Sequence, residues 1–123
     1  MHETIILNWH DAINTRDLER ARETVSDPLV VTGPKGSAAI TADEFTDWVI
    51  HSAVRLHPVN WHPVGGEIAV VEQDATWPEA PVPVRVATMF RVSQERVSAA
   101  LRFPDVEQAL AFATLYAVLA ETD

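Results

Sequence analysis

The chain has 123 residues, a length that fits one domain able to bury roughly two-thirds of its unfolded surface. Its 18 acidic and 9 basic residues give a net charge of −9, which argues against binding nucleic acid or anionic membranes. The absence of cysteine excludes disulfides, thiol nucleophiles and cysteine-based zinc sites. No apolar run approaches the roughly 20 residues of a membrane helix, and the start MHETIILNWHD is not a signal peptide, so we expect a cytoplasmic protein.

The first half of the sequence predicts three helices. Residues 3–14 carry an apolar stripe at helical spacing. A second amphipathic helix follows, capped by Thr15 and ended by Ser26-Asp27-Pro28. The stretch Thr41-Ala42-Asp43-Glu44 is a capping box, in which a hydroxyl and a carboxylate accept hydrogen bonds from free backbone N–H groups. The helix that it opens should run past Leu56 and stop at His57-Pro58.

The remaining segments predict strands and one last helix. A short strand at 29–32 leads into Gly33-Pro34-Lys35-Gly36, a turn without the spacing of a phosphate loop. Further strands are expected at 59–64, at 67–77 and in a hairpin over 82–103; Pro63 marks the first of these as short or at an edge. The last helix begins with Asp105 as its cap. The order α-α-β-α-β-β-β-β-α predicts an α+β fold, with helices covering one face of a four-stranded meander.

A period of two assigns the inner face of the sheet. In the hairpin, the inner row is Val84, Val86, Thr88, Phe90, Val92, Val97, Ala99, Leu101 and Phe103, with Ser98 and Arg102 on the outer side. In strand 67–77 we place Gln73 and Trp77 inward, because the other phase buries the carboxylates of Glu72 and Asp74. A turn centred near Ala80 and Pro81 then puts Gln73 opposite Thr88. This polar pair is either a hydrogen bond within the core or a polar anchor at the bottom of an apolar ligand cavity.

The tryptophans and histidines do not distinguish a packed core from a binding site. Trp9, Trp48, Trp61 and Trp77 fit a packed core, and equally the walls of a cavity. His10 lies beside the buried stripe of the first helix rather than in it. His51, His57 and His62 are close in sequence, but their spacing does not stack them on one helical turn, so we expect neither a metal site nor a cofactor.

Several motifs resemble the nuclear transport factor 2-like superfamily, and within it the SnoaL-like and ketosteroid isomerase branch. They are the N-x-x-D-L end of the first helix, the V-x-x-P-x-G loop at Val31–Gly36 and the M-F-R-V…R-V-S-x-x-x-R-F hairpin. The resemblance covers about residues 3–104. It implies a single SnoaL-like domain over residues 1–123, in which a curved, mostly antiparallel sheet forms a cone around the N-terminal helices and a C-terminal helix follows. It also implies a deep apolar pocket, and dimerisation is common in this superfamily.

The resemblance allows the isomerase's catalytic positions to be compared with this chain. Its pocket tyrosine falls on Trp9, its general-base aspartate on Gly33 and its protonated aspartate on Thr88. None of these residues can take over the corresponding role. No Asp or Glu stands on the predicted inner face either, so isomerisation by that mechanism is not expected.

The function implied by the resemblance is binding of a small apolar molecule, with or without a reaction of isomerase, cyclase or dehydratase type. We place the pocket at Trp9, Trp61, Gln73, Trp77, Thr88 and Phe90. The alternative is a non-catalytic dimeric interaction or scaffold module whose cavity is filled by its own tryptophans. A carboxylate or histidine within hydrogen-bond reach of Gln73 and Thr88 would favour an enzyme.

We also expect a homodimer. The last helix has a second apolar side, and the outer face of the sheet carries apolar side chains among its charges. The residues concerned are Phe112, Leu115 and Leu119 on the helix, and Ala87, Met89 and Ala100 on the sheet.

Overall fold

The computed structural model describes residues 2–33 and 36–122. Its elements are α1 (His2–Thr15), α2 (Leu18–Thr24), β1 (Val25–Gly33), β2 (Gly36–Ile40), α3 (Ala42–Ser52), β3 (Arg55–Gly65), β4 (Ile68–Trp77), β5 (Ala80–Ser93), β6 (Arg96–Phe103) and α4 (Val106–Glu121). The strands form one sheet in the order β2-β1-β6-β5-β4-β3, in which β1 and β6 are parallel and the other neighbours antiparallel. No helix in these two ranges has both the length and the apolar character needed to span a membrane.

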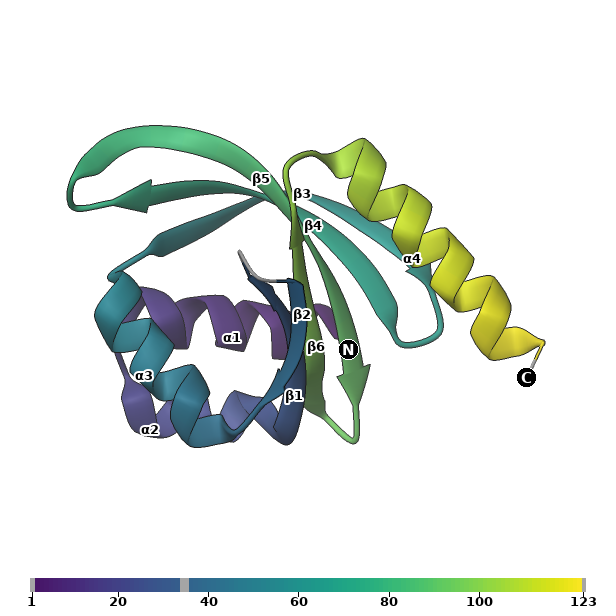
Figure 1. The fold of residues 1–123 in the computed structure, drawn as a ribbon, viewed down its shortest axis with the longest axis horizontal. Coiled ribbons are helices and arrows are strands. Elements are labelled where there is room, and N and C mark those ends of the chain that lie inside the picture. The colour runs from purple at the N-terminus through teal and green to yellow at the C-terminus, as the bar shows by residue number, and fades with distance from the viewer. Residues whose placement is uncertain (1, 34–35, 123) are drawn as a thin grey trace.

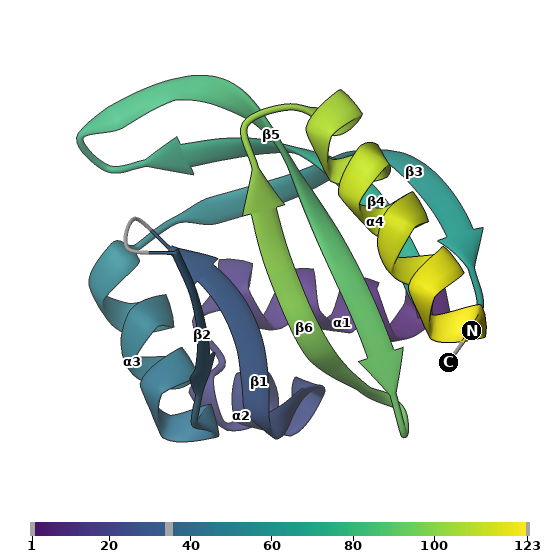
Figure 2. The same cartoon turned by 45° about the vertical axis from the view of Figure 1, so that its right-hand side comes forward.

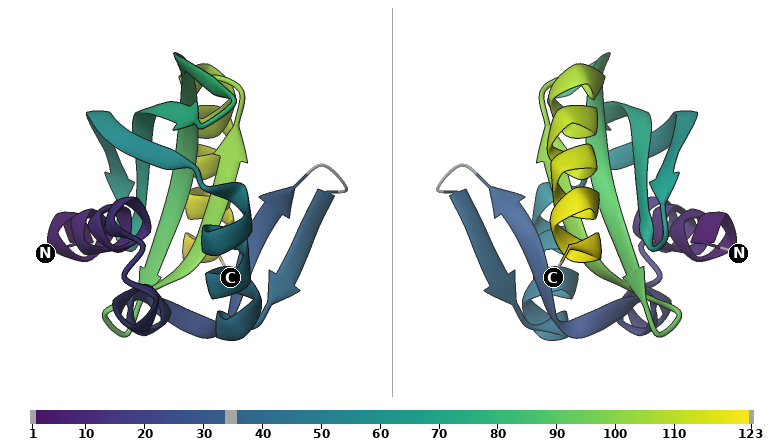
Figure 3. Two further views of the ribbon diagram at one scale, coloured as in Figure 1. Left: turned by 90° about the vertical axis from the view of Figure 1, so that its left-hand side faces the viewer. Right: turned by 90° about the vertical axis from the view of Figure 1, so that its right-hand side faces the viewer.

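The sheet is curved and separates two layers of helices. Helices α1, α2 and α3 lie on its concave side, and α4 lies across the convex side (Figure 1, Figure 2). Strands β1 and β2 splay away from β4 and β5, which deepens the curvature (Figure 3). The predicted α+β cone with enclosed N-terminal helices and a C-terminal helix is confirmed. The sheet is larger than the expected meander, because β1 joins it beside β6 and β2 was not predicted.

Each side of the sheet has its own apolar core. The concave core joins α1 and α3 to the strands through Ile6, Trp9, Ile13, Phe45, Val49, Val71, Ala75, Val86, Phe90 and Val92. The inward phase assigned to β4 and to most of β5 is therefore correct. The convex core lies under α4 and contains Ile68, Val70, Ala87, Met89, Ala99, Leu101, Ala109 and Ala113. The expectation that Ala87 and Met89 are open to a partner chain was wrong, because the first apolar stripe of α4 covers them.

The helix caps follow the sequence signals with one exception. Thr41 and Glu44 form the predicted capping box, with the Thr41 hydroxyl accepting from the Glu44 N–H at 3.1 Å and the Glu44 carboxylate accepting from the Thr41 N–H at 2.9 Å. Asp105 caps α4 as expected. Helix α2 is capped by Asp17, and the Thr15 hydroxyl instead donates to a carbonyl within α1. The prediction of Thr15 as the cap was therefore wrong by two residues.

Two element boundaries differ from the prediction. Helix α3 ends at Ser52, where Ala53 turns the chain with a positive φ of 52°, so Leu56 lies in β3 rather than in the helix. An alanine gives no sequence signal for such a turn, since glycine is the usual residue there. Strand β3 stands at the sheet edge, as Pro63 indicated. Gly33 and Gly36 pair at the end of the β1–β2 hairpin, while Pro34 and Lys35 lie outside the described residues.

A bulge in β6 reverses the predicted faces of the second half of that strand. Arg91 pairs with Ala99, but the next residue of β5, Val92, pairs with Val97, so Ser98 is an extra residue in the ladder. One extra residue moves every later side chain to the opposite face. Accordingly Ala99 and Leu101 face α4, whereas Ala100 packs against the concave core. The assignment of Ala99 and Leu101 to the inner face, and of Ala100 and Arg102 to the outer face, was wrong for this reason.

Candidate functional site

The concave side of the sheet holds a cavity of about 660 Å³, between α1, α3 and the strands β1, β2, β5 and β6. This volume lies within the range of roughly 300 to 1,000 Å³ typical of small-molecule sites. Most of the wall is aromatic or aliphatic. The lining residues are Trp9, Val31, Thr32, Ile40, Glu44, Phe45, Trp48, Val86, Thr88, Ala100, Arg102, Phe103 and Pro104.

The structure brings two of the six expected pocket residues, Trp9 and Thr88, to the cavity wall. Gln73 and Phe90 have no exposed surface and lie behind that wall. Trp61 on β3 and Trp77 at the end of β4 are partly buried against the same core without lining the cavity. Most of the other lining residues come from α3, β1 and β6 instead.

Gln73 and Thr88 are hydrogen-bonded neighbours, as expected. The Thr88 hydroxyl donates to the Gln73 side-chain oxygen at 2.6 Å. The register is nevertheless two residues away from the predicted one, because Thr88 stands opposite Val71, and Gln73 opposite Val86. A shift of two residues keeps every side chain on its face, so the pair meets diagonally across the strands.

A buried histidine extends this pair. His10 is only 2% exposed, and its Nδ1 lies 2.8 Å from the Ile6 carbonyl oxygen. Its Nε2 lies 2.7 Å from the Gln73 side-chain nitrogen. The placement of His10 beside the stripe was wrong. It stands four residues after Ile6 and three before Ile13, both buried, and this helical spacing indicates the inner face.

The carbonyl of Ile6 fixes the direction of every hydrogen bond in the chain His10–Gln73–Thr88. A carbonyl can only accept, so His10 carries its proton on Nδ1, and Nε2 accepts from the Gln73 amide. The Gln73 oxygen then faces Thr88, and the Thr88 hydroxyl must donate to it. Because the Thr88 hydrogen is used inside the wall, the oxygen of Thr88 can only accept from a group in the cavity.

Burial keeps His10 neutral. Removal from water lowers the pKa of His10 from 6.5 to about 4, although the bond to the Ile6 carbonyl acts in the opposite direction. The neutral form is the one that the hydrogen-bond chain requires, since a proton on Nε2 would face the Gln73 amide N–H. His10 does not line the cavity; it is linked to Thr88 in the wall through Gln73, and its ring centroid lies 4.9 Å from that of Trp9.

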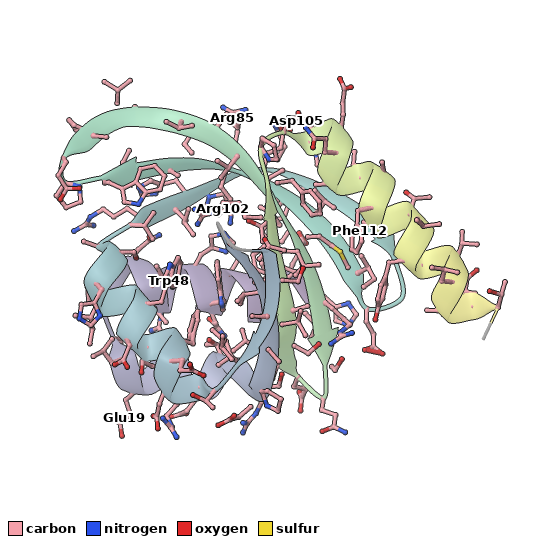
Figure 4. All side chains as sticks on the ribbon, in the orientation of Figure 1. Glu19, Trp48, Arg85, Arg102, Asp105 and Phe112 are labelled. Atoms are coloured by element: carbon pink, nitrogen blue, oxygen red, sulfur yellow. The ribbon has the colours of Figure 1, made fainter. Side chains whose placement is uncertain are left out.

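Arg102 is a charged residue of the cavity wall. It is half-buried on β6 directly opposite Thr88 on β5, a spacing at which side chains on one face are neighbours. Figure 4 shows Arg102 and Trp48 on the α1–α3 side of the sheet, with Phe112 on α4 beyond its other side. Sequence reasoning missed Arg102 because the bulge at Ser98 leaves no signal in the alternation of polar and apolar residues.

The cavity offers no evident metal site. In residues 2–33 and 36–122, no three His, Asp or Glu side chains gather closely enough to bind a metal ion. The lining carboxylate, Glu44, already accepts the Thr41 N–H as part of the capping box. The indole N–H of Trp9 is buried and has no acceptor among the described residues. The wall therefore combines the donor side chain of Arg102 with acceptor oxygens of Thr88 and Glu44 in mainly apolar surroundings.

No family model matches the sequence, and no curated protein matches it either. Solved structures do. An NTF2-like protein of unknown function from Cytophaga hutchinsonii superposes with a TM-score of 0.75 at 10% identity, covering 88% of this chain and 93% of its own. A candidate polyketide cyclase from Sinorhizobium meliloti gives 0.71 at 17%, covering 81% and 94%. TerC co-crystallised with polyporic acid gives 0.71 at 12%, covering 93% and 98%.

Identities this low carry information on the fold alone. The structural neighbours share the layout described above over most of both chains. The fold that the sequence resemblance implied is thereby confirmed: the chain has the nuclear transport factor 2-like fold.

Proposed function

We propose that the chain is a single SnoaL-like domain over residues 1–123 that binds a small, mainly apolar molecule in the cavity between α1, α3 and the sheet. The observation that carries this proposal is a volume of about 660 Å³ with apolar walls and few polar groups. Two structural neighbours support it, since one is a candidate polyketide cyclase and the other was crystallised with polyporic acid.

The wall favours a flat, ring-containing ligand. Trp9 and Phe45 stack at 6.2 Å between ring centroids, and Phe45 and Trp48 at 5.9 Å, both with 25° between the ring planes. The three rings, each tilted by 25° from its neighbour, form a row of aromatic contacts in the cavity wall, against which an aromatic or alicyclic molecule gains more contact than a branched one. A scaffold whose own tryptophans fill the cavity is less well supported, because Trp61 and Trp77 do not line it.

The second candidate function is an enzyme of isomerase, cyclase or dehydratase type. It is favoured by His10, a histidine within hydrogen-bond reach of Gln73. The position of His10 speaks against direct base catalysis, because Gln73 occupies its Nε2 and separates it from the cavity. Trp9 and Thr88 also replace two of the isomerase's catalytic positions. We therefore propose binding as the primary function, with Thr88 as a polar anchor.

Association into a homodimer is part of the proposal. The apolar side of α4 that faces away from the sheet is exposed: Phe112 by 39%, Leu115 by 57%, Val118 by 51% and Leu119 by 60%. Four large apolar side chains on one helix face are usually covered by another chain, and a second copy is the commonest source. A cytoplasmic location is also proposed, in keeping with a sequence free of cysteine.

The binding proposal is tested by filling the cavity. Ala100 lines it, and Ala100→Phe places a ring inside. Isothermal titration with the neutral bicyclic probe 2-naphthamide should detect binding to the wild type and at least a tenfold loss in Ala100→Phe. Ala80→Phe, at the exposed start of β5 outside the cavity lining, is the matched control and should bind as the wild type does. A folded Ala100→Phe variant with unchanged affinity would refute the site. Native mass spectrometry of freshly purified protein should reveal a retained small molecule.

A further inference from the structure

We propose that the molecule bound in this cavity carries an anionic group, such as a carboxylate or an enolate, that pairs with the guanidinium of Arg102. This inference rests on the proposed binding function and names the chemical class of the ligand. It begins from a cationic side chain that the fold holds at a mainly apolar cavity without an ion pair to any described residue.

The backbone holds Arg102 firmly at the cavity. The hydroxyl of Thr32 on β1 accepts a hydrogen bond from the Arg102 N–H at 2.9 Å and donates to the Arg102 carbonyl at 3.2 Å. The Thr32 side chain on β1 thus serves as the hydrogen-bond partner of the Arg102 backbone on β6. Thr32 also lines the cavity. On the other side, β5 places Thr88 directly opposite Arg102. A residue tied to both neighbouring strands has little freedom to turn its side chain away from the concave face.

Arg102 lacks an acidic partner among residues 2–33 and 36–122. Arg20, Arg22 and Arg85 each form an ion pair with an aspartate, with side chains 41%, 49% and 48% exposed. Arg102 is half-buried, yet its guanidinium has neither an ion pair nor a hydrogen bond within the described part of the chain. A guanidinium remains charged in proteins, and charges removed from water are normally paired. Burial alone lowers the pKa of Arg102, with no acidic neighbour acting against it.

Among the described residues, no other polar side chain of the wall pairs with the Arg102 guanidinium. Glu44 is held by the capping box at the start of α3. The Trp9 N–H is a second donor without an acceptor in the described residues. The Trp9 nitrogen is itself buried, so the guanidinium of Arg102 is the donor that matches a group rich in acceptor oxygens. An arginine fork binds a carboxylate through two parallel hydrogen bonds, the strongest polar contact available here.

Charge and ring contacts together define the ligand class. The stacked rings of Trp9, Phe45 and Trp48 face an apolar body, and Arg102 on β6 faces its charged end. The protein as a whole carries a net charge of −9, so its long-range field repels anions. A preference for an anionic ligand must therefore come from its short-range contact with Arg102. Substitution of Arg102 alone tests this.

The test compares two probes of nearly equal shape, 2-naphthoate and neutral 2-naphthamide, by isothermal titration at one ionic strength. We expect the wild type to bind 2-naphthoate at least tenfold more tightly than 2-naphthamide. Arg102→Met should abolish this preference, so that the ratio of the two affinities falls to about one. Arg96→Met, which removes the same charge from the exposed start of the same strand, is the matched control and should keep the preference.

The outcomes separate the two proposals. Equal affinities for both probes in the wild type, or a preference that survives Arg102→Met, would overturn the anionic ligand and leave the cavity as a binding site. Failure of both probes to bind the wild type would overturn the binding function itself. Arg102→Gln replaces Arg102→Met if the latter does not fold, and Arg102→Lys should retain part of the preference because it keeps the charge and loses the fork geometry.

Discussion

The His10 ring and the Gln73 side chain, 63 positions apart in sequence, meet inside the concave core with 2.7 Å between His10 Nε2 and the Gln73 nitrogen. This contact ties α1 to the centre of the sheet. It also makes the protonation state of one imidazole a condition for the orientation of Thr88 at the cavity wall.

The free energy of unfolding should decrease as the pH is lowered, because of His10. Its pKa is about 4 in the fold and near 6.5 in the unfolded chain, so the unfolded chain binds the proton first. The stabilisation is fully present above pH 6.5 and is lost as the pH falls toward 4, by about 3 kcal/mol at most. Urea unfolding at several pH values measures it. His10→Gln should flatten the dependence between pH 6.5 and 4.5, whereas exposed His51→Gln should leave it as in the wild type. Equal slopes in all three proteins would contradict the prediction.

Replacement of both Gln73 and Thr88 by apolar residues should destabilise the fold. If Gln73 and Thr88 satisfied only each other, Gln73→Met with Thr88→Val would cost little. The double change instead leaves His10 Nε2 buried without a partner, and we expect a loss of about 1–3 kcal/mol. Adding His10→Phe should recover part of that loss. Urea denaturation measures the free energies of unfolding of the wild type and of the double and triple variants. A double variant as stable as the wild type would show that His10 does not need Gln73 as a hydrogen-bond partner.

The capping assignment gives a matched pair of threonines. Thr41→Ala removes the side-chain acceptor at the start of α3 and should cost about 1 kcal/mol. Thr15→Ala should have a smaller effect, because Asp17 caps α2. Thermal unfolding of the two variants measures the difference. A loss in Thr15→Ala as large as that in Thr41→Ala would contradict the assignment of Asp17.

The exposed side of α4 predicts the oligomeric state. Light scattering at high micromolar concentration should give twice the chain mass of 13.6 kDa for the wild type. Leu115→Glu puts a charge into the proposed contact and should give the monomer mass. Leu7→Glu, an exposed position on α1, is the control and should stay dimeric. A monomeric wild type would refute the dimer.

The sequence was a good guide wherever a regular period runs unbroken. The alternation through β4 placed Gln73 inward, and the spacing of α4 separated the stripe that packs on the sheet from the exposed one. Prediction from the sequence failed where the conformation of a single residue ends a helix or shifts the alternation of a strand. Ala53 ends α3 without a glycine signal, and Ser98 inserts a residue into β6. Arg102, the residue on which the ligand class depends, lies just beyond such a point, and periodicity alone could not have placed it.

The bulge at Ser98 also has an evolutionary consequence. Deletion of this one residue would exchange the two sides of β6 beyond it, turning Arg102 toward α4 and Leu101 toward the cavity. The polarity of the cavity thus depends on the length of a hairpin arm as much as on which residues occupy it. Within this fold, a single-codon insertion or deletion offers a route from a cavity for anions to a cavity for neutral molecules without any substitution in the lining.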